Sequence, residues 1–248
     1  RPWQYEDTAS PPAYRLQTID DADRLLADMP HIKSPLVIGS SFIALEFIEI
    51  FLHHGITPRV LAATDGFFSA FADKEGSKIL ERNLQSRGVS CIFDAAITAC
   101  RRDGDDYTLD IAGGDTLRAD AFAIGIGVES QRDFLEDSGI ILGKRGIKTD
   151  EYLETNVKDI YVAGDAAEYY DLISGDYRTA GNWTHAVLQG TRAGLNMAGE
   201  HAAFTAIPNY AITNCGMRIA AIGECGGKGV SALTRRGSYR ILPRLVYG

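Results

Sequence analysis

The chain has 248 residues, of which 45% are hydrophobic and 23% are charged, and its formal net charge is -8. These values are usual for a globular protein with a sizeable core, and the acidic balance argues against a general nucleic-acid binder. The longest apolar run, at 42–52, is interrupted by Glu46 and Glu49, so no membrane-spanning segment is expected.

The four cysteines, Cys91, Cys100, Cys215 and Cys225, contain no Cys-x-x-Cys pair. This spacing argues against a zinc ribbon and against a thioredoxin-type redox pair. Reduced cysteines in a cytoplasmic protein are the simpler interpretation, and no metal site is predicted. The chain begins with Arg1 rather than Met, which favours a fragment or a processed product.

The first hundred residues alternate between strand and helix patterns. Apolar strands are predicted at 35–39, 59–63 and 91–93, and helices at 20–27, 42–53 and 73–87. The long apolar helix should end at His53-His54-Gly55, because cations complement a helix C-terminus and glycine takes a left-handed conformation there. This order is typical of a doubly wound sheet.

Short extended segments follow at 96–101, 107–112 and 116–117, punctuated by glycine turns at 104–105 and 113–114. A buried strand at 119–127 then returns to the sheet. A second unit begins near Val128, contains a buried strand at 160–163 and closes with a helix at 183–199. Strands and turns are expected after 202, including a hairpin turn at 222–230, where Gly-Lys lacks the Ser or Thr of a P-loop.

The segment from Gly39 to Glu46, GSSFIALE, lies between a strand and a helix, which is the context of a dinucleotide-binding turn. Such a turn brings the backbone close to a pyrophosphate, and the helix N-terminus directs N–H groups at it. Ser41 stands where the fingerprint has its second glycine, and Ala44 where it has its third. Serine at that position either adds a hydroxyl donor or crowds the phosphate.

The segment from Thr155 to Tyr170 carries the most informative motif, in which the strand at 160–163 runs into Gly164-Asp165. A carboxylate at a strand end of an open α/β sheet lies where ligands bind, and it suits the hydroxyl groups of a sugar-like chain. A simple Gly-Asp turn after a buried strand is the alternative.

These motifs resemble those of the pyridine nucleotide-disulfide oxidoreductase family, in particular its rubredoxin reductase, NADH oxidase and nitrite reductase flavoprotein branch. The Thr-x5-Tyr-x-x-Gly-Asp pattern ending at Asp165 is similar to the family's second flavin motif. The segment 39–46 is similar to its NAD motif, and Gly125-Ile126-Gly127 to its crossover motif. A tight domain crossover is the alternative for these last glycines.

The resemblance implies an α/β fold in which a doubly wound, Rossmann-like NAD domain is inserted in a partial FAD-binding domain. The implied divisions are 1–32 for the end of the first FAD segment, 33–124 for the NAD(P)-binding domain, 125–201 for the second FAD segment and 202–248 for the start of an α+β C-terminal interface domain. The first half of the FAD domain, with any redox cysteine, would then lie upstream of Arg1.

The resemblance also implies roles for individual residues. Asp165 would bond the ribityl chain of FAD, Phe42 would lie over the flavin, and Glu46 would contact the nicotinamide. Phe42 as simple core and Glu46 as part of a solvated helix stripe are the alternatives. The implied cofactor-binding residues are Gly39, Ser40, Ser41, Phe42, Ile43, Glu46, Ala62, Gly125, Ile126, Gly127, Gly164, Asp165, Trp183, Thr184, His185 and Ala186.

Alternatives stay open at Ala62, at the cap of the last helix and at His185. Ala62 stands where an acidic residue normally selects NAD, so the sequence does not decide between NAD and NADP. Asn182 or Thr184 is expected to cap the helix at 183–199, whose N-terminus would face the pyrimidine edge of the flavin. His185 is either part of that site or an ordinary histidine near the cap, and no proton-transfer role is assigned to it.

The implied activity is that of a FAD-dependent NAD(P)H oxidoreductase that passes hydride from nicotinamide to flavin and electrons on to rubredoxin, ferredoxin, oxygen or a disulfide. A non-catalytic nucleotide-binding relative is the alternative, favoured by Ser41, Ala62 and the altered Glu129-Ser130-Gln131. A homodimer is one possible assembly. We expect two adjoining nucleotide clefts, and weak retention of FAD by a chain that lacks half of the cofactor's contacts.

Overall fold

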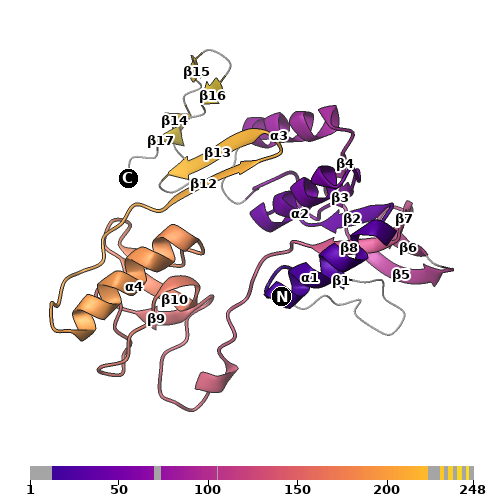
Figure 1. The fold of residues 1–248 in the computed structure, drawn as a ribbon. Helices are drawn as coiled ribbons and strands as arrows, with labels where there is room; N and C mark the ends of the chain where they lie inside the picture. The colour runs from indigo at the N-terminus through magenta and orange to yellow at the C-terminus, as the bar shows by residue number, and fades with distance from the viewer. Residues whose placement is uncertain are drawn as a thin grey trace. The chain divides into compact units, whose positions relative to one another are not determined.

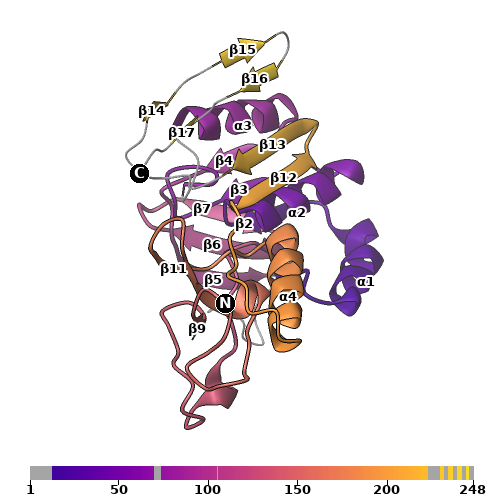
Figure 2. The same cartoon turned by 90° about the vertical axis from the view of Figure 1, so that its left-hand side faces the viewer.

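The structure is a computed structural model that describes residues 13–69, 74–104 and 106–222, together with short strand segments after residue 229 (Figures 1 and 2). The described chain divides into two compact units. The first contains the described residues up to Gly127 and the hairpin segment Thr213–Met217, and the second contains Val128–Ile212.

A five-stranded parallel sheet forms the centre of the first unit, with the strand order β1-β8-β2-β3-β4. In this sheet Val37 lies opposite Val60 on one side and Ala123 on the other. Every residue of β2 and β8 is buried, which explains why both read as continuous apolar runs. The strands are β1 (Ala13–Tyr14), β2 (Pro35–Ile38), β3 (Arg59–Leu61), β4 (Ser90–Ile92) and β8 (Ala121–Ile124).

Three helices accompany this sheet: α1 (Ile19–Asp28), α2 (Phe42–His53) and α3 (Lys74–Ser86), with a short 3-10 turn η1 (Met29–His31) after α1. α1 begins with a capping box, in which Thr18 and Asp21 satisfy each other's backbone N–H groups. α2 has the predicted bounds, and Gly55 after it takes a φ of 74°. Asp73, the predicted start of α3, lies outside the described residues.

The predicted meander is an antiparallel sheet of β5 (Ile97–Asp103), β6 (Asp106–Ile111) and β7 (Thr116–Ala119). Its buried residues Leu109 and Tyr107 join a hydrophobic core with Phe122 of β8, and the Tyr107 and Phe122 ring centroids are 6.2 Å apart. The turn glycines Gly113 and Gly114 both have positive φ, as a tight hairpin requires. Asp105 of the earlier turn is outside the described residues.

The second unit contains a three-stranded sheet, in which β10 (Ala167–Asp171) pairs parallel with β9 (Ile147–Thr149) and antiparallel with β11 (Asp176–Arg178). Two 3-10 turns occur, η2 (Asp133–Leu135) and η3 (Gly164–Ala166). The long helix α4 (Trp183–Met197), orange in Figure 1, contacts η3. The hydrophobic core of the second unit contains Leu153, Tyr169, Ala180, Ala193 and Phe204.

The buried strand predicted at 160–163 is wrong. Ile160 is 40% exposed, and this segment contributes only an isolated bridge between Tyr161 and Glu154. The N–H of Val162 donates to the Leu153 carbonyl at 3.0 Å, so the segment folds back on the preceding turn rather than joining a sheet. A four-residue apolar run does not specify its pairing partner, and the regular strand, β10, begins after Gly164-Asp165 instead.

Strands and turns follow α4, as the sequence predicts. β12 (Asn209–Asn214) pairs with β13 (Met217–Ile222), β14 (Val230–Ser231) with β17 (Arg244–Leu245), and β15 (Thr234–Arg236) with β16 (Tyr239–Ile241). The turn predicted at 222–230 lies almost wholly outside the described residues. Within the part of the chain that the structure describes, no helix combines the length and the apolar character needed to cross a membrane.

Candidate functional site

The glycine turn after β2 is pressed against the end of β8. Gly39 has a φ of 119°, and a Cβ added to it would lie 2.2 Å from the Gly125 carbonyl oxygen. A Cβ on Gly125 would in turn lie 2.7 Å from the Ala44 nitrogen in the first turn of α2. The two glycines therefore let the turn, the strand end and the helix N-terminus approach one another without intervening side chains.

Ser41 is the N-cap of α2, and its hydroxyl is engaged within the protein. It donates to the Gly125 carbonyl at 2.8 Å and accepts from the Ala44 N–H at 3.5 Å. Its φ of -89° is ordinary for an L-residue, so this position does not require glycine. Since the hydroxyl proton is directed to Gly125, an anion at this helix end would be bound by backbone N–H groups of the first turn, such as those of Phe42 and Ile43.

The loop after β3 closes over the same turn. Ser40 and Thr64 share a hydrogen bond of 2.8 Å between their hydroxyls, and the Phe68 N–H donates to the Ser40 carbonyl at 3.0 Å. The rings of Phe42 and Phe68 lie 4.3 Å apart between centroids. The sequence analysis did not identify Phe68 as part of this site. The pair Phe67-Phe68 just after a predicted strand could have indicated an aromatic contact in this loop. Phe42, which is half-buried, therefore has an aromatic neighbour from this loop.

Glu46 lies one turn beyond Phe42 on α2 and has an exposed side chain. Although the residue as a whole is exposed, nearby protein atoms partly desolvate its carboxyl group, and this desolvation raises the pKa of Glu46 above that of an ordinary glutamate. The Ala62 side chain at the end of β3 is buried, and its N–H donates to the Ile92 carbonyl at 2.9 Å. Asp65, three residues later, is exposed and lies 3.9 Å from the Lys74 ammonium.

In the second unit, Gly164 begins the turn η3 against α4. Its φ is 74°, and an added Cβ would lie 3.3 Å from the Ala186 Cβ. The Gly164 N–H donates to the Gln189 side-chain oxygen at 2.7 Å, and both groups are buried. Glycine is therefore required here for both backbone conformation and close contact.

Asp165 is exposed, and its carboxylate lies beside the residue that precedes the α4 N-cap. A Cβ on Gly181 would be 3.8 Å from an Asp165 carboxylate oxygen. Asn182 caps α4 by accepting from the His185 N–H at 2.8 Å, as expected for one of the two candidate caps. Trp183 is 85% exposed, and Thr184 is also exposed. An acceptor and a helix N-terminus thus share one surface.

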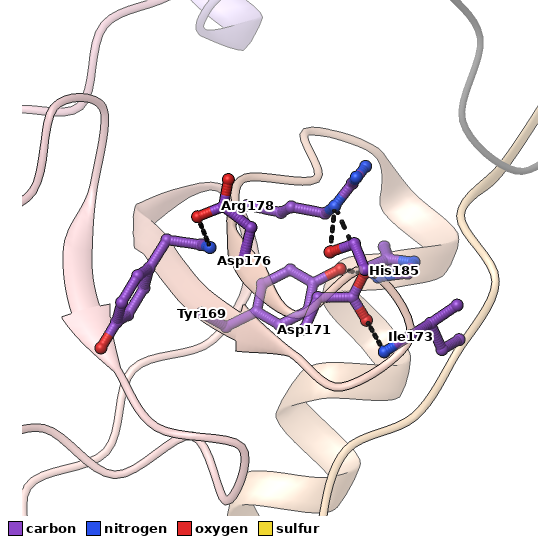
Figure 3. Close-up of polar contacts among 8 residues, drawn as sticks. Tyr169, Asp171, Ile173, Asp176, Arg178 and His185 are labelled. Carbon is purple, nitrogen blue, oxygen red and sulfur yellow. Dashed lines mark hydrogen bonds and ion pairs between the residues drawn. The ribbon is translucent and has the colours of Figure 1, made fainter. Parts of the chain in front are cut away.

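The His185 side chain points into the core of the second unit (Figure 3). It is fully buried, and its Nε2 lies 3.2 Å from the Tyr169 hydroxyl. Burial lowers the pKa of His185 and raises that of Tyr169 to about 12, so both groups are neutral. Asp171 and Arg178 form a nearby ion pair of 3.3 Å. The His185 ring is therefore part of the core rather than of the surface that carries Asp165.

The structure thus assembles the candidate residues in two groups. In the first unit the turn, the loop after β3 and the end of β8 bring together Gly39, Ser40, Ser41, Phe42, Ala62 and Gly125. Ile126 is half-buried and Gly127, with a φ of 97°, is exposed. In the second unit Gly164, Asp165 and Ala186 lie together at the start of α4. No cluster of three or more metal-ligating side chains occurs within the described ranges.

A glycine turn that leads from a buried parallel strand into a capped helix is typical of dinucleotide-binding α/β proteins. A family model described as pyridine nucleotide-disulphide oxidoreductase matches residues 6–190. The chain belongs to this family.

Relatives with curated names agree with this assignment. The chain is 28% identical over 186 residues to the 3-phenylpropionate/cinnamic acid dioxygenase ferredoxin–NAD(+) reductase component of Photorhabdus laumondii, a match that covers 75% of this chain and 47% of that protein. It is 25% identical to the NADH-rubredoxin oxidoreductase of Clostridium acetobutylicum, covering 85% and 51%. The chain therefore spans about half the length of the curated relatives it matches.

Solved structures share the fold. The ferredoxin reductase for the CYP199A2 system from Rhodopseudomonas palustris superposes with a TM-score of 0.83 at 22% identity, covering 89% of this chain and 54% of that one. The water-forming NADH oxidase from Lactobacillus brevis also gives 0.83, at 18% identity, covering 91% and 52%. The doubly wound, Rossmann-like fold predicted from the sequence is confirmed.

Proposed function

We propose that the protein containing this chain is a FAD-dependent NAD(P)H oxidoreductase. The observation that carries the proposal is the contact between Gly39, Gly125 and Ala44 at the N-terminus of α2, because a contact without side chains at a helix end suits a bound pyrophosphate. Family membership and the names of the relatives supply the redox class.

In this proposal the first unit binds the nicotinamide dinucleotide. The N–H groups in the first turn of α2 hold its pyrophosphate, Phe42 and Glu46 lie toward its nicotinamide, and Ala62 lies near its adenosine ribose. The buried Ala62 offers no carboxylate to a ribose hydroxyl. The choice between NADH and NADPH then rests on groups such as Asp65, which lies 3.9 Å from the exposed Lys74 ammonium.

The second unit supplies part of the FAD site. Asp165 accepts hydrogen bonds from the ribityl hydroxyls, and the N-terminus of α4, with Trp183 and Thr184, faces the electron-rich edge of the ring. FAD, when bound, supplies the hydride chemistry, and the protein's groups bind and orient it. The proposal keeps the domain division, with the NAD(P)-binding domain at 33–124 and the second FAD segment at 125–201.

The electron acceptor is proposed to be a small redox protein or a small molecule. Ferredoxin and rubredoxin occur in the names of the relatives, which supports a small redox protein. A non-catalytic nucleotide-binding role is the second candidate, and a specific observation favours it. The Ser41 hydroxyl donates to the Gly125 carbonyl, and the Ala62 side chain is buried. Two positions that usually contact the dinucleotide therefore make contacts within the protein instead.

Titration with FAD tests the proposed flavin site. Asp165→Ala should weaken FAD binding by about tenfold or more, because a charged acceptor contributes roughly 1.5–3 kcal/mol to a hydrogen bond. Asp176→Ala, which removes another exposed carboxylate of the same unit, should leave it unchanged. Equal affinity of the wild type and the Asp165 variant for FAD would remove the basis of this assignment.

A further inference from the structure

One buried hydrogen bond in the second unit is not accounted for by the cofactor contacts proposed above. The Gly164 N–H donates to the Gln189 side-chain oxygen at 2.7 Å, and the Gln189 side chain is fully buried. Gln189 lies one helical turn beyond His185 on the inward face of α4, so it does not reach the surface that carries Asp165. Among the described residues, its hydrogen-bond partner near that surface is the backbone N–H of Gly164.

Other contacts restrain the turn in addition to this hydrogen bond. Gly164 is held in a left-handed conformation against Ala186, and the Ala167 N–H closes η3 onto the Gly164 carbonyl. Ser130 donates to the Asp165 carbonyl at 3.2 Å from an exposed position. The Gln189 oxygen is thus a buried side-chain acceptor for the backbone N–H immediately before Asp165, and it helps to set the position of the Asp165 backbone.

We propose that Gln189 is a positioning residue that holds the Gly164-Asp165 turn in the conformation that presents the Asp165 carboxylate to a polyhydroxyl ligand. The inference rests on the proposed function for the identity of that ligand, the ribityl chain of FAD. The role of Gln189 itself rests on the contacts of this chain. A buried N–H that loses its acceptor is left unsatisfied at a cost in free energy, which favours conformations in which the turn moves off α4.

The nitrogen of the Gln189 amide has no comparable contact among the described residues. Gln189 Nε2 and His185 Nδ1 are the two buried side-chain atoms of α4 for which no hydrogen-bond partner is found among the described residues. They belong to residues four apart on one helix face, where side chains meet. The two atoms are not hydrogen-bonded to each other, whereas the His185 Nε2 lies 3.2 Å from the Tyr169 oxygen.

The hydrogen bonds of this region are thus two separate ones, from the Gly164 N–H to the Gln189 oxygen and between the His185 Nε2 and the Tyr169 hydroxyl. Burial lowers the pKa of His185 and so keeps the ring neutral. The positioning role of Gln189 therefore rests on its bond to Gly164.

Substitution of Gln189 tests the positioning role. Gln189→Met keeps the length and loses the acceptor, whereas Gln189→Glu keeps an acceptor oxygen. Hydrogen exchange of the Gly164 amide should speed up by about tenfold or more in the Met variant, and FAD should bind about tenfold more weakly. The Glu variant should stay within about threefold of the wild type in both measurements.

Ala193→Gly provides the matched control, because it weakens the same helix one turn further on without touching the Gly164 amide. It should lower the melting temperature. Exchange of the Gly164 amide should change no more than the loss of global stability requires, and FAD affinity should stay unchanged. A purely structural role for Gln189 would make the Met variant behave like this control, and that result overturns the proposal. Should the Met variant fail to fold, the wild-type Gly164 amide decides the question: slow exchange supports the proposal, and exchange as fast as that of an exposed amide overturns it.

The two proposals fail in different ways. If Asp165→Ala leaves FAD binding intact while Gln189→Met frees the Gly164 amide, then the flavin assignment is wrong and Gln189 still positions the turn. If Asp165→Ala abolishes FAD binding while Gln189→Met changes neither the exchange nor the affinity, then the flavin site stands and the positioning role is wrong.

Discussion

Substitution of Gly39 by alanine tests the close contact on which the nucleotide site depends. The change has two costs. A φ of 119° is strained for any residue with a Cβ, by about 1–3 kcal/mol, and the new methyl group would lie 2.2 Å from the Gly125 carbonyl oxygen. Relief of such an overlap costs a further 1–3 kcal/mol or so. Gly39→Ala should therefore lower the free energy of unfolding by about 2–6 kcal/mol.

Gly55→Ala is the matched control. Gly55 also has a positive φ, of 74°, but nothing lies within 4 Å of its added Cβ. Only the backbone strain of about 1–2 kcal/mol is then expected. Urea unfolding of the two variants isolates the contact, and NADH titration should show weaker binding for Gly39→Ala alone. Equal stability of the two variants, with equal NADH affinity, would refute the reasoning that the turn and strand end are in obligatory contact.

Two further substitutions test other hydrogen bonds of the structure. Ser41→Ala should cost about 1–2 kcal/mol in urea unfolding, because it removes an N-cap and the bond to Gly125; an unchanged midpoint would contradict this. Glu168→Gln should destabilise the second unit. The buried Glu168 carboxylate accepts from the N–H groups of Lys144, Arg145 and Gly146 at 3.3, 2.7 and 3.0 Å, respectively. The amide of glutamine offers fewer acceptor sites to these three donors. Burial raises the pKa of Glu168, but the three N–H donors together lower it below the ordinary value. The ionised Glu168 therefore stabilises the fold above about pH 4–5, and this stabilisation is lost as the pH falls further. A variant whose acid unfolding matches that of the wild type would refute this.

The sequence was sufficient where local chemistry marks both ends of an element. The bounds of α2 follow from an apolar run between a serine cap and a His-His-Gly terminus, and the structure has the same bounds. The strand at 160–163 shows the limit of such reasoning. Its apolar side chains favour burial, but the backbone partners that decide strand pairing lie elsewhere in the chain, and here they are the residues of the preceding turn.

Contacts between distant residues explain what sequence reasoning missed at the site. The bond from Ser41 to Gly125 joins residues 84 positions apart, so the question of whether the serine serves a phosphate could not be answered from its own neighbourhood. The capping region of α4 was recognised, but the direction of the His185 ring is set by Tyr169 and Phe204 in the core. Gln189 carried no motif, and only the structure joins it to Gly164.

Anaerobic titration of the FAD-loaded protein with NADH and NADPH tests the central claim most directly. The proposed function predicts that one equivalent of the preferred nucleotide bleaches the visible absorbance of the bound flavin, because transfer of hydride from the nicotinamide would reduce it. Tight binding of both FAD and nucleotide without any bleaching would contradict it and would favour the non-catalytic nucleotide-binding role.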